Sequence, residues 1–327
     1  MTRYAITGAT GFTGGALAKT LAADGADLVA LVRASSDTRE LTTHGIRCVA
    51  LSLLDADAVA DALAGIDVVF HIAAAYRAEH SDVDEFHQVN VEATRVLLDA
   101  AVRNGVKRFV HCSTVGVQGA IDEPPASESY RLAPGDHYQQ SKLDGEQLAM
   151  SYADRDIEVT VVRPVGIYGP GDERFLKLFK AIDRNLFLMI GSGETLYHLT
   201  YIDDLVKGFT LAAHHPAAPG EVFTICGARY TTLNELTDAI AQAMGRTRRR
   251  WKVPSLPVVW AAHVCDWVCK RIGVAPPLYP RRVEFFLLDR AFTHAKASQY
   301  LGYEPSVGLE DGLQRTLQWY REQGLVR

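Results

Sequence analysis

The amino-acid sequence predicts an α/β fold, in which a doubly wound parallel sheet is followed by a smaller C-terminal lobe. Three observations support this prediction. Short β-branched runs alternate with helical patterns through the first half of the 327 residues, and a glycine-rich turn follows the first of these runs. After Pro164 the alternation becomes irregular and rich in turns. Because parallel strands end at one edge of their sheet, we expect a ligand site at that edge.

Each predicted strand in the first half is followed by a helical pattern, as in parallel βαβ units. The predicted strands are Arg3–Thr7, Leu28–Val32, Arg47–Leu51, Val68–Ile72, Arg108–Cys112 and Glu158–Arg163. The predicted helices between them include Gly14–Ala23, Ala56–Leu63, Asn90–Arg103 and Tyr138–Tyr152. In the second half the patterns predict a late strand at Glu221–Cys226 and helices at Glu173–Asn185, Asp203–Ala213, Leu233–Met244 and Leu309–Gln323.

The composition is that of an ordinary globular protein, with 48% hydrophobic and 22% charged residues. A net charge of -5 provides no basic field that would attract nucleic acid. The one basic run, Arg246 with Arg248, Arg249 and Arg250, is interpreted as a solvated loop rather than an anion site, since no aromatic pattern surrounds it. The N-terminus runs straight into a strand, so no signal peptide is expected.

Five cysteines without regular spacing predict no disulfide framework and fit a reducing cytoplasm. Cys265 and Cys269 could share a helix face, but only His263 and Asp266 lie near them, so no metal site is predicted. The segment Leu256–Ile272 is the most apolar long stretch, yet it carries charged residues and is short for a membrane span. We therefore expect a packed helix here, with a membrane-surface helix as the alternative, and no integral span.

Gly8, Gly11 and Gly14 follow the first strand with two residues between them and open the first helix. Gly8 permits the tight turn, Gly11 leaves room for a pyrophosphate, and Gly14 lets the helix pack closely on the sheet. The N-terminus of that helix offers free N–H groups and a positive dipole end to an anion. This context predicts a Rossmann dinucleotide-binding domain over residues 1–165, to which residues 200–226 return, and a substrate-binding lobe formed mainly by residues 166–327.

The end of the second predicted strand carries Arg33, where an NAD-binding protein would place an acidic residue for the ribose hydroxyl. An arginine there can pair with the 2′-phosphate of NADP and stack on adenine. Asp37 lies too far along the chain to replace the missing acid. The sequence therefore favours NADP, with NAD as the alternative. If Arg33 does not bind the cofactor, it is an exposed residue that only ends the strand.

Tyr138 and Lys142 form a Tyr-x-x-x-Lys pair, which a helix places on one face. A phenol is a poor base at neutral pH, but a neighbouring ammonium stabilises the phenolate and lowers the tyrosine pKa. Lys142 can also hold the nicotinamide ribose. Upstream, Ser113 and Thr114 follow a predicted strand, where a hydroxyl can bond the same substrate oxygen. Together with the glycine turn, this set predicts a nicotinamide-dependent enzyme.

These motifs resemble those of the extended short-chain dehydrogenase/reductase superfamily over essentially the whole chain. The matching segments are Thr7–Gly14, His71–Ala75, Val89–Val91, Ser113–Thr114, Tyr138–Lys142, Arg163–Pro170 and Tyr201–Asp204. The resemblance implies that Thr114, three residues before Val117, is the third catalytic residue beside Tyr138 and Lys142. It also implies that Asn90 holds a strand and a helix in register near the site. The alternative role of Asn90, which does not exclude the first, is a helix N-cap.

The resemblance also implies a set of cofactor contacts and a homodimer. Ser52 stands where the superfamily usually carries an aspartate against adenine, and Asp55 is then interpreted as a helix cap. The apolar faces of Asn90–Arg103 and Tyr138–Tyr152 resemble those of helices that pair in family dimers. The residues expected to bind the cofactor are Gly8, Thr10, Gly11, Phe12, Thr13, Arg33, Ser52, Leu53, Ala73, Ala74, Ala75, Asn90, Ser113, Tyr138, Lys142, Pro164 and Gly166.

The superfamily includes substrate oxidoreductases and epimerases or dehydratases of nucleotide-activated sugars, and Tyr197 bears on the choice. Sugar-nucleotide enzymes commonly place an arginine at this position, because a diphosphate prefers a bidentate cation. Tyr197 disfavours such a substrate, although His198, Arg174 and Arg229 remain possible anion partners. The tail, over residues 276–305, looks like the 3β-hydroxysteroid dehydrogenase branch. The first half looks equally like hopanoid-associated epimerase-like proteins and dihydroflavonol reductases.

The leading hypothesis is reversible hydride transfer between NADP(H) and a hydroxyl or ketone of a largely apolar or polycyclic small molecule, sterol-like or flavonoid-like. The residues expected to contact this substrate are Tyr76, Arg77, Val115, Val165, Gly166 and Tyr197. The alternative is a nucleotide-sugar epimerase or dehydratase that recycles a tightly held cofactor. A third hypothesis, a dinucleotide-sensing regulator without catalysis, is disfavoured by the intact set of Thr114, Tyr138 and Lys142.

Overall fold

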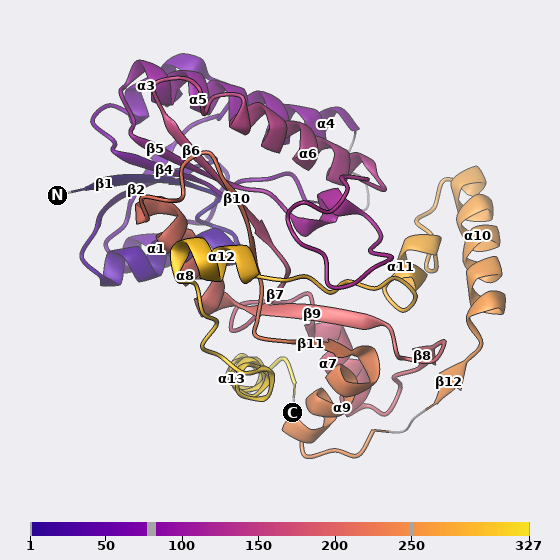
Figure 1. The fold of residues 1–327 in the computed structure, drawn as a ribbon. Helices are drawn as coiled ribbons and strands as arrows, with labels where there is room; N and C mark the ends of the chain where they lie inside the picture. Colours follow the sequence, from indigo (N-terminus) through magenta and orange to yellow (C-terminus); the bar gives the residue numbers. More distant parts are fainter. Residues whose placement is uncertain (1, 77–82, 249–250, 327) are drawn as a thin grey trace.

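In the computed structural model, which describes residues 2–76, 83–248 and 251–326, six strands of the first half of the chain and one of the second half form a seven-stranded sheet (Figure 1). Its strands are β1 (Arg3–Thr7), β2 (Asp27–Val32), β3 (Arg47–Ala50), β4 (Val68–His71), β5 (Arg108–Cys112), β6 (Glu158–Pro164) and β10 (Val222–Ile225). They are parallel, in the order β10-β6-β5-β4-β1-β2-β3. The predicted strands are confirmed to within one residue at each end, and the doubly wound α/β prediction is correct.

Helices cover both faces of this sheet (Figure 1). On one face lie α3 (Ala56–Ala62), α4 (Val83–His87), α5 (Ala93–Arg103) and α6 (His137–Met150); on the other lie α1 (Phe12–Ala23), α8 (Ile202–His214) and α12 (Ala295–Leu301), and the short α2 (Arg39–Thr43) leads into β3. Side chains of β1 alternate between two buried cores. Ile6 packs with Leu17 of α1 and Phe209 of α8, whereas Ala5 packs with Leu97 of α5. With both faces covered, the carboxyl ends of the strands are left to form a site.

The smaller lobe is built from short strands and helices of the second half. Strands β7 (Gly166–Tyr168), β9 (Leu196–Tyr201) and β11 (Tyr230–Thr232) form a three-stranded sheet, and β8 (Met189–Ile190) pairs with β12 (Lys252–Val253). The helices are α7 (Leu176–Asp183), α9 (Leu233–Ala243), α10 (Ser255–Ile272), α11 (Pro280–Glu284) and α13 (Leu309–Glu322). Phe179, Tyr201 and Leu317 belong to its core. In contrast, α8 and β10 pack on the large sheet.

The predicted helix Asn90–Arg103 begins earlier than expected. Helix α4, a π-helical turn η1 (Gln88–Glu92) and α5 follow one another without a break in helical backbone. Asn90 therefore lies inside a helix, and its alternative role as an N-cap is wrong. Its side chain bonds to groups outside the helix, which is the reason a polar residue is buried at this position.

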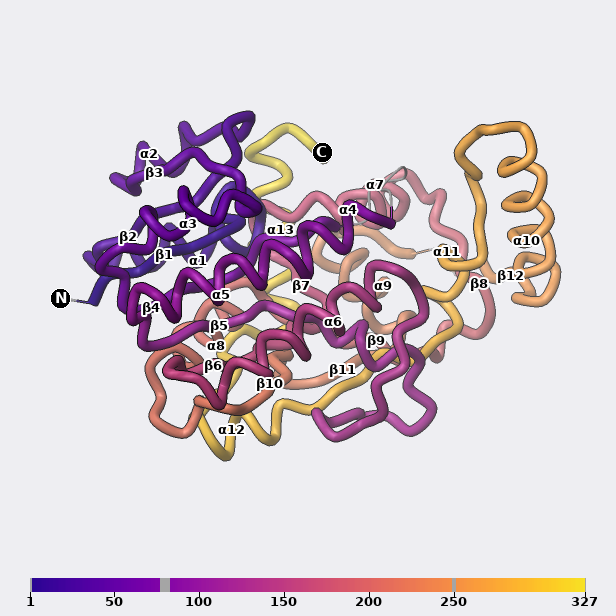
Figure 2. Tube along the Cα trace, turned by 90° about the horizontal axis from the view of Figure 1, so that it is seen from above, coloured from indigo at the N-terminus to yellow at the C-terminus, as the bar shows by residue number. Residues whose placement is uncertain are grey.

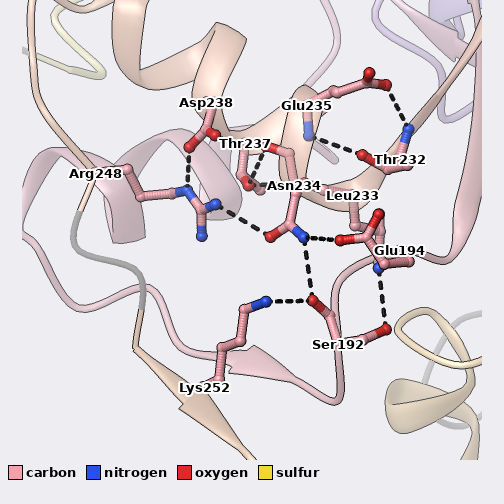
Figure 3. A network of polar contacts seen from close by, with 10 residues as sticks. All are labelled: Ser192, Glu194, Thr232, Leu233, Asn234, Glu235, Thr237, Asp238, Arg248 and Lys252. Atoms are coloured by element: carbon pink, nitrogen blue, oxygen red, sulfur yellow. Dashed lines mark hydrogen bonds and ion pairs between the residues drawn. The ribbon is translucent and has the colours of Figure 1, made fainter.

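The interpretation of the basic run as a solvated loop is wrong for Arg248, which is buried. Its Nε donates to Asp238 Oδ1 at 2.7 Å and its Nη2 donates to Asn234 Oδ1 at 3.2 Å (Figure 3). Both partners belong to α9, so the arginine joins the chain after this helix back to it. Arg246 forms an ion pair with the last residue of α7 at 3.1 Å, and residues 249–250 lie outside the described residues.

The segment Leu256–Ile272 is helical, as predicted, but it is not packed on both sides. The structure describes every residue of α10, and among them Ala262 and Cys269 are buried. Figures 1 and 2 both show α10 at one edge of the molecule, away from the large sheet. The expectation of a packed helix is therefore wrong. No helix in the described ranges is long and apolar enough to cross a membrane.

Candidate active site

A cavity of about 1870 Å³ lies at the carboxyl ends of the strands, between the large sheet and the lobe. One side, termed the sheet wall, draws on residues 8–14, 31–36, 51–54, 72–76, 112–116 and 138–142. The other, termed the lobe wall, draws on residues 164–167, 174–178, 197–198 and 279–292. Every predicted site residue that the structure describes lines this cavity except Asn90, which lies behind it. Arg77 lies outside the described residues.

The glycine turn closes the sheet wall against the end of β4. Gly8 has a φ of +74°, and a Cβ there would lie 2.7 Å from the Ala73 nitrogen. A Cβ on Gly14 would overlap the carbonyl of Gly8. Helix α1 then begins after Gly11, with no side chain capping its first N–H groups. A cradle with no room for side chains, at the N-terminus of a twelve-residue helix, fits the pyrophosphate of a dinucleotide.

A directed chain of hydrogen bonds lies behind this turn. The Ala73 N–H donates to Thr7 Oγ1 at 3.1 Å, and the Thr7 hydroxyl lies 2.8 Å from His71 Nδ1. On the other side, His71 Nε2 lies 2.9 Å from Thr94 Oγ1, whose hydroxyl donates to the Asn90 carbonyl at 2.9 Å. Because the Thr94 hydrogen is already donated, His71 donates from Nε2 and accepts at Nδ1. Burial lowers the pKa of His71 to about 3, so the ring is neutral.

Asn90 connects the segment after β4 to helix α6. Its Oδ1 accepts from the Ala75 N–H at 2.8 Å, and its Nδ2 donates to Ser141 Oγ at 2.9 Å. Ser141 lies in α6 between Tyr138 and Lys142, the two residues of the predicted pair. Helix α6 can approach this closely because Gly145 faces the Asn90 carbonyl, and a Cβ there would overlap that oxygen. The asparagine thereby sets the position of the Tyr-x-x-x-Lys turn relative to the sheet wall.

The three predicted catalytic residues all line the sheet wall. Asp136 caps α6 by accepting from the Gln139 N–H at 2.7 Å, which places Tyr138 in the first turn and Lys142 one turn later. Lys142 is buried, and its Nζ donates to the Cys112 carbonyl at 2.6 Å. Burial lowers the pKa of this lysine. Thr114 follows β5, caps the short η2 (Val115–Gln118) through its hydroxyl and lines the same cavity.

The hydroxyl of Ser113 is used by a buried network that sequence reasoning missed. Ser113 Oγ donates to Glu146 Oε2 at 2.5 Å, and Glu146 also accepts from Arg163 Nε at 3.0 Å and Nη2 at 2.5 Å. Both charged side chains are only 4% exposed. Ser113 therefore helps to join β5, α6 and β6, and Thr114 is the residue of the two whose hydroxyl is not engaged in this network. No local pattern connects positions 113, 146 and 163, so only the fold reveals the set.

The far end of the sheet wall holds Arg33 and Ser52. Arg33 is exposed at the end of β2 and lines the cavity. Ser52 lies in the turn after β3, where its Oγ accepts from the Leu54 N–H at 3.2 Å. Asp55 caps α3 by accepting from the Ala58 N–H at 3.1 Å, which confirms its interpretation as a helix cap.

The lobe wall is mainly aromatic around Tyr197. The ring of Tyr197 makes edge contacts with Phe175 and Phe285, at centroid distances of 6.4 and 5.1 Å. Burial raises the pKa of Tyr197, so its hydroxyl stays protonated. Across the cavity, Tyr76 packs edge-on against Tyr138 at 5.3 Å. Aromatic side chains therefore line the cavity on both walls.

The three residues considered as anion partners are engaged elsewhere. His198 is buried, with Nε2 2.9 Å from the Gly227 carbonyl and Nδ1 3.1 Å from the Phe292 carbonyl, and burial lowers its pKa to about 4. Arg174 forms an ion pair with a buried aspartate at 2.6 Å. Arg229 pairs with a glutamate of α13 at 3.0 Å. None of the three is a free cation within the described part of the chain.

The lobe wall also contains residues that the sequence did not point to. Arg281, in α11, forms an ion pair with Asp136, the N-cap of helix α6, which carries the predicted pair. This contact joins segments far apart in the chain, and no spacing in the sequence signals it. The other cavity-lining residues of segment 279–292 were not predicted either: Tyr279, Pro280, Arg282, Glu284, Phe285, Phe286, Leu288, Arg290 and Phe292.

The model of the NAD dependent epimerase/dehydratase family matches residues 4–226, more than half of the chain. The chain belongs to this family. The resemblance to the extended short-chain dehydrogenases/reductases is thereby confirmed, and the protein is an NAD(P)-dependent enzyme of that type.

The proteins similar to this chain include hydroxysteroid dehydrogenases and an enzyme of nucleotide-activated sugars. The chain is 30% identical to 3beta-hydroxysteroid-dehydrogenase/decarboxylase isoform 2 of Arabidopsis thaliana over 85% of its own length, but spans about half, 52%, of that protein. It is 31% identical to a 3 beta-hydroxysteroid dehydrogenase/Delta 5-->4-isomerase of Mycobacterium tuberculosis over 97% of this chain and 90% of that protein. A solved structure of DesIV, a dTDP-glucose 4,6-dehydratase from Streptomyces venezuelae with NAD and TYD bound, is similar with a TM-score of 0.78 and 28% identity, covering 98% and 97% of the two chains.

Proposed function

We propose that this protein transfers a hydride reversibly between NADP(H) and a hydroxyl or ketone of a largely apolar, polycyclic substrate such as a sterol. The observation that carries the proposal is the lobe wall, where Tyr197 lies between Phe175 and Phe285. An aromatic wall favours an apolar ring system, because each ring offers a large apolar surface. The names of the relatives from Arabidopsis thaliana and Mycobacterium tuberculosis support the same class of substrate.

In this proposal the dinucleotide supplies or accepts the hydride, and the residues of the chain handle the proton and the substrate oxygen. The Tyr138 hydroxyl gives a proton to the carbonyl oxygen during reduction and takes it back during oxidation. Thr114 donates a hydrogen bond that orients the same oxygen. The ammonium of Lys142 lies one helical turn from Tyr138, favours its phenolate and so lowers its pKa. The glycine turn, Ser52 and the residues after β4 would hold the dinucleotide.

We propose NADP rather than NAD as the preferred cofactor. Arg33 provides a cation at the end of β2, where NAD-binding proteins place a carboxylate. The nearest downstream acid, Asp37, forms an ion pair with Arg39 at 2.5 Å, and this neighbour lowers the pKa of Asp37 to about 2. Because the Asp37 carboxylate is engaged with Arg39, we infer that Arg33 recognises the 2′-phosphate of the cofactor.

Three further expectations belong to this proposal. Residues 1–165, together with 200–226, bind the cofactor, and residues 166–327 mainly bind the substrate. The chain forms a homodimer through the helices α5 and α6. It acts in a reducing cytoplasm, in accordance with five free cysteines and no regular cysteine spacing.

The experiment is a comparison of wild-type protein with Tyr138→Phe on a 3β-hydroxysterol and on UDP-glucose, read at the absorbance of the reduced nicotinamide. The variant should lose about 10²- to 10⁴-fold in kcat while its affinity for NADP stays unchanged. Tyr300→Phe, on α12, is the matched control and should behave as wild type.

Conversion of the sugar nucleotide without net change in nicotinamide absorbance would support the epimerase alternative instead. Full sterol activity in Tyr138→Phe would remove the catalytic role of this residue.

A further inference from the structure

Helix α10 carries an apolar stripe on the side away from the rest of the protein. Leu256, Trp260, Val264 and Trp267 recur at helical spacing, with exposed fractions of 82%, 71%, 40% and 56%. Arg271 continues the stripe, and its guanidinium lies 4.1 Å from the centre of the Trp267 ring. These five residues are termed the outer face of α10. Both Figure 1 and Figure 2 show this helix at the edge of the molecule.

The opposite side of α10 lies at the rim of the cavity. Ala262 and Cys269 are buried on this side. Asp266 and Lys270, which form an ion pair at 2.7 Å, line the cavity together with residues of α11. The same helix therefore borders the cavity with one face and exposes apolar side chains with the other.

The composition of this surface indicates what covers it. Residues 251–274 contain three of the protein's four tryptophans, and all three are exposed. Arg271 is the charged residue of the outer face, and the segment around it carries Lys252 and Lys270 against a single acid, Asp266, although the whole chain has a net charge of -5. Tryptophan rings prefer the interface between water and lipid, and the long stems of lysine and arginine reach anionic headgroups from there.

The base of α10 is attached to a part of the lobe that carries two further exposed leucines. Leu186 and Leu188, which are 72% and 42% exposed, precede β8, and β8 pairs with β12 at the base of α10. Figure 3 shows how this base is attached: Lys252 Nζ donates to the Ser192 carbonyl at 2.6 Å, and Asn234 of α9 donates to the same oxygen at 3.1 Å. The base of the helix is therefore fixed to the lobe.

We propose that the outer face of α10 lies in the surface of an anionic lipid bilayer and holds the rim of the cavity against it. The helix would lie in the headgroup region rather than cross the bilayer. A second copy of the chain is the competing occupant, since tryptophan and arginine also occur often in interfaces between proteins, and the test below separates the two. Delivery of an apolar substrate from the bilayer into the cavity follows if the proposed function holds; binding to the bilayer does not depend on it.

The test uses the full chain and vesicles of phosphatidylcholine, with and without phosphatidylglycerol, in the absence of substrate. The wild-type protein should co-sediment with the anionic vesicles. Its tryptophan emission should shift to the blue, and acyl chains carrying bromine should quench it, because Trp260 and Trp267 enter the lipid.

Single substitutions of the outer face separate its apolar and charged parts. Trp260→Ser and Trp267→Ser should each weaken binding by about tenfold, as expected for the loss of one buried aromatic side chain. Arg271→Glu should weaken binding to the anionic vesicles alone. Tyr300→Ser, an exposed aromatic on α12, is the matched control and should bind as wild type. Unchanged NADP affinity in each variant shows that it is folded.

Two results would overturn the proposal. In the first, the wild-type protein fails to bind anionic vesicles, or binds them equally well after Trp260→Ser and Trp267→Ser. In the second, sedimentation velocity shows a dimer that these substitutions convert to a monomer, which assigns the outer face to a second copy. Inactivity on sterols would count against the proposed function alone, since the vesicle measurements contain no substrate.

Discussion

The two walls of the cavity are built by different means. On the sheet wall, backbone meets backbone: a Cβ on Gly14 would overlap the Gly8 carbonyl, and buried hydrogen bonds fix the segments after β4 and β5. On the lobe wall, aromatic side chains such as Tyr197 and Phe285 pack edge to face. Backbone contacts tolerate little change, whereas side chains can be exchanged without moving the chain. Under the proposed function, cofactor binding would thus depend on the fold, and substrate choice would depend on side chains of the lobe.

The largest effect is expected from the buried ion pair behind the sheet wall. The substitution Glu146→Gln leaves the guanidinium of Arg163 buried without its counter-charge. Removing one partner of such a pair costs about 3–5 kcal/mol of unfolding free energy. Urea unfolding followed by circular dichroism measures this loss.

The exposed pair between Arg229 and Glu310 in the lobe is the matched control. Both side chains are more than half exposed, and Glu310→Gln should change the free energy of unfolding by less than about 1 kcal/mol. Equal losses in the two variants would mean that the sheet wall is no more rigidly built than the lobe.

The next effect concerns the glycine turn. In Gly14→Ala the added methyl group meets the Gly8 carbonyl, so α1 must move away from the cradle. Affinity for NADP, measured by calorimetry, should fall by about a hundredfold or more, the consequence expected when a close backbone approach is lost. Gly25→Ala tests backbone strain alone, since Gly25 has a φ of +77° and open space around it. That variant should lose stability but keep its cofactor affinity; unchanged affinity in Gly14→Ala would contradict the backbone model of this wall.

The difference between the walls also explains what could be predicted from the sequence. The strands and the glycine turn are local patterns, because apolar β-branched runs and backbone sterics depend on neighbouring residues. Tyr138 and Lys142 lie one helical turn apart, so their spacing alone brings them together. The described residues predicted for the cavity, apart from Asn90, do line it.

What could not be predicted depends on contacts between distant segments. Glu146 meets Arg163 and Ser113 only after β5, α6 and β6 have packed. Arg248 looks solvated in a basic run, yet α9 supplies two acceptors for its guanidinium. The apolar residues of α10 suggested that the helix is buried. The sequence shows that a side chain is apolar, but it does not show what covers that side chain in the folded protein.

A smaller effect, on the pH dependence of stability, is expected from two buried histidines, one behind each wall. Burial holds the pKa of His111 well below 6.5 and lowers that of His198 to about 4. Below pH 6.5 the two histidines bind protons in the unfolded chain but stay neutral in the folded protein. The free energy of unfolding is therefore greatest above that pH and declines as the pH falls. From pH 7 to pH 5 His198 contributes a loss of about 2 kcal/mol, and His111 contributes a loss of the same sign. Urea unfolding at the two pH values should show the loss of stability reduced by about 2 kcal/mol in His198→Gln and reduced in His111→Leu as well.

The two variants should differ at pH 7. No described residue hydrogen-bonds to the ring of His111, so an apolar replacement should leave the free energy of unfolding unchanged within about 1 kcal/mol. His198 contacts the carbonyls of Gly227 and Phe292, and its loss should destabilise the lobe. A pH dependence unaltered by His111→Leu would show that this ring is not held neutral.

The smallest effect is expected at Arg33, where the sheet wall relies on a side chain and should behave like the lobe wall. Arg33→Ser should lower the preference for NADP over NAD by about tenfold, as expected for one exposed charge-assisted contact to a phosphate. Values of kcat/KM with each cofactor measure the ratio. Arg47→Ser is the control, because Arg47 is exposed at the start of β3 and does not line the cavity. An equal loss with both cofactors would assign Arg33 to stacking on adenine, and no loss would leave it an exposed residue at the end of β2.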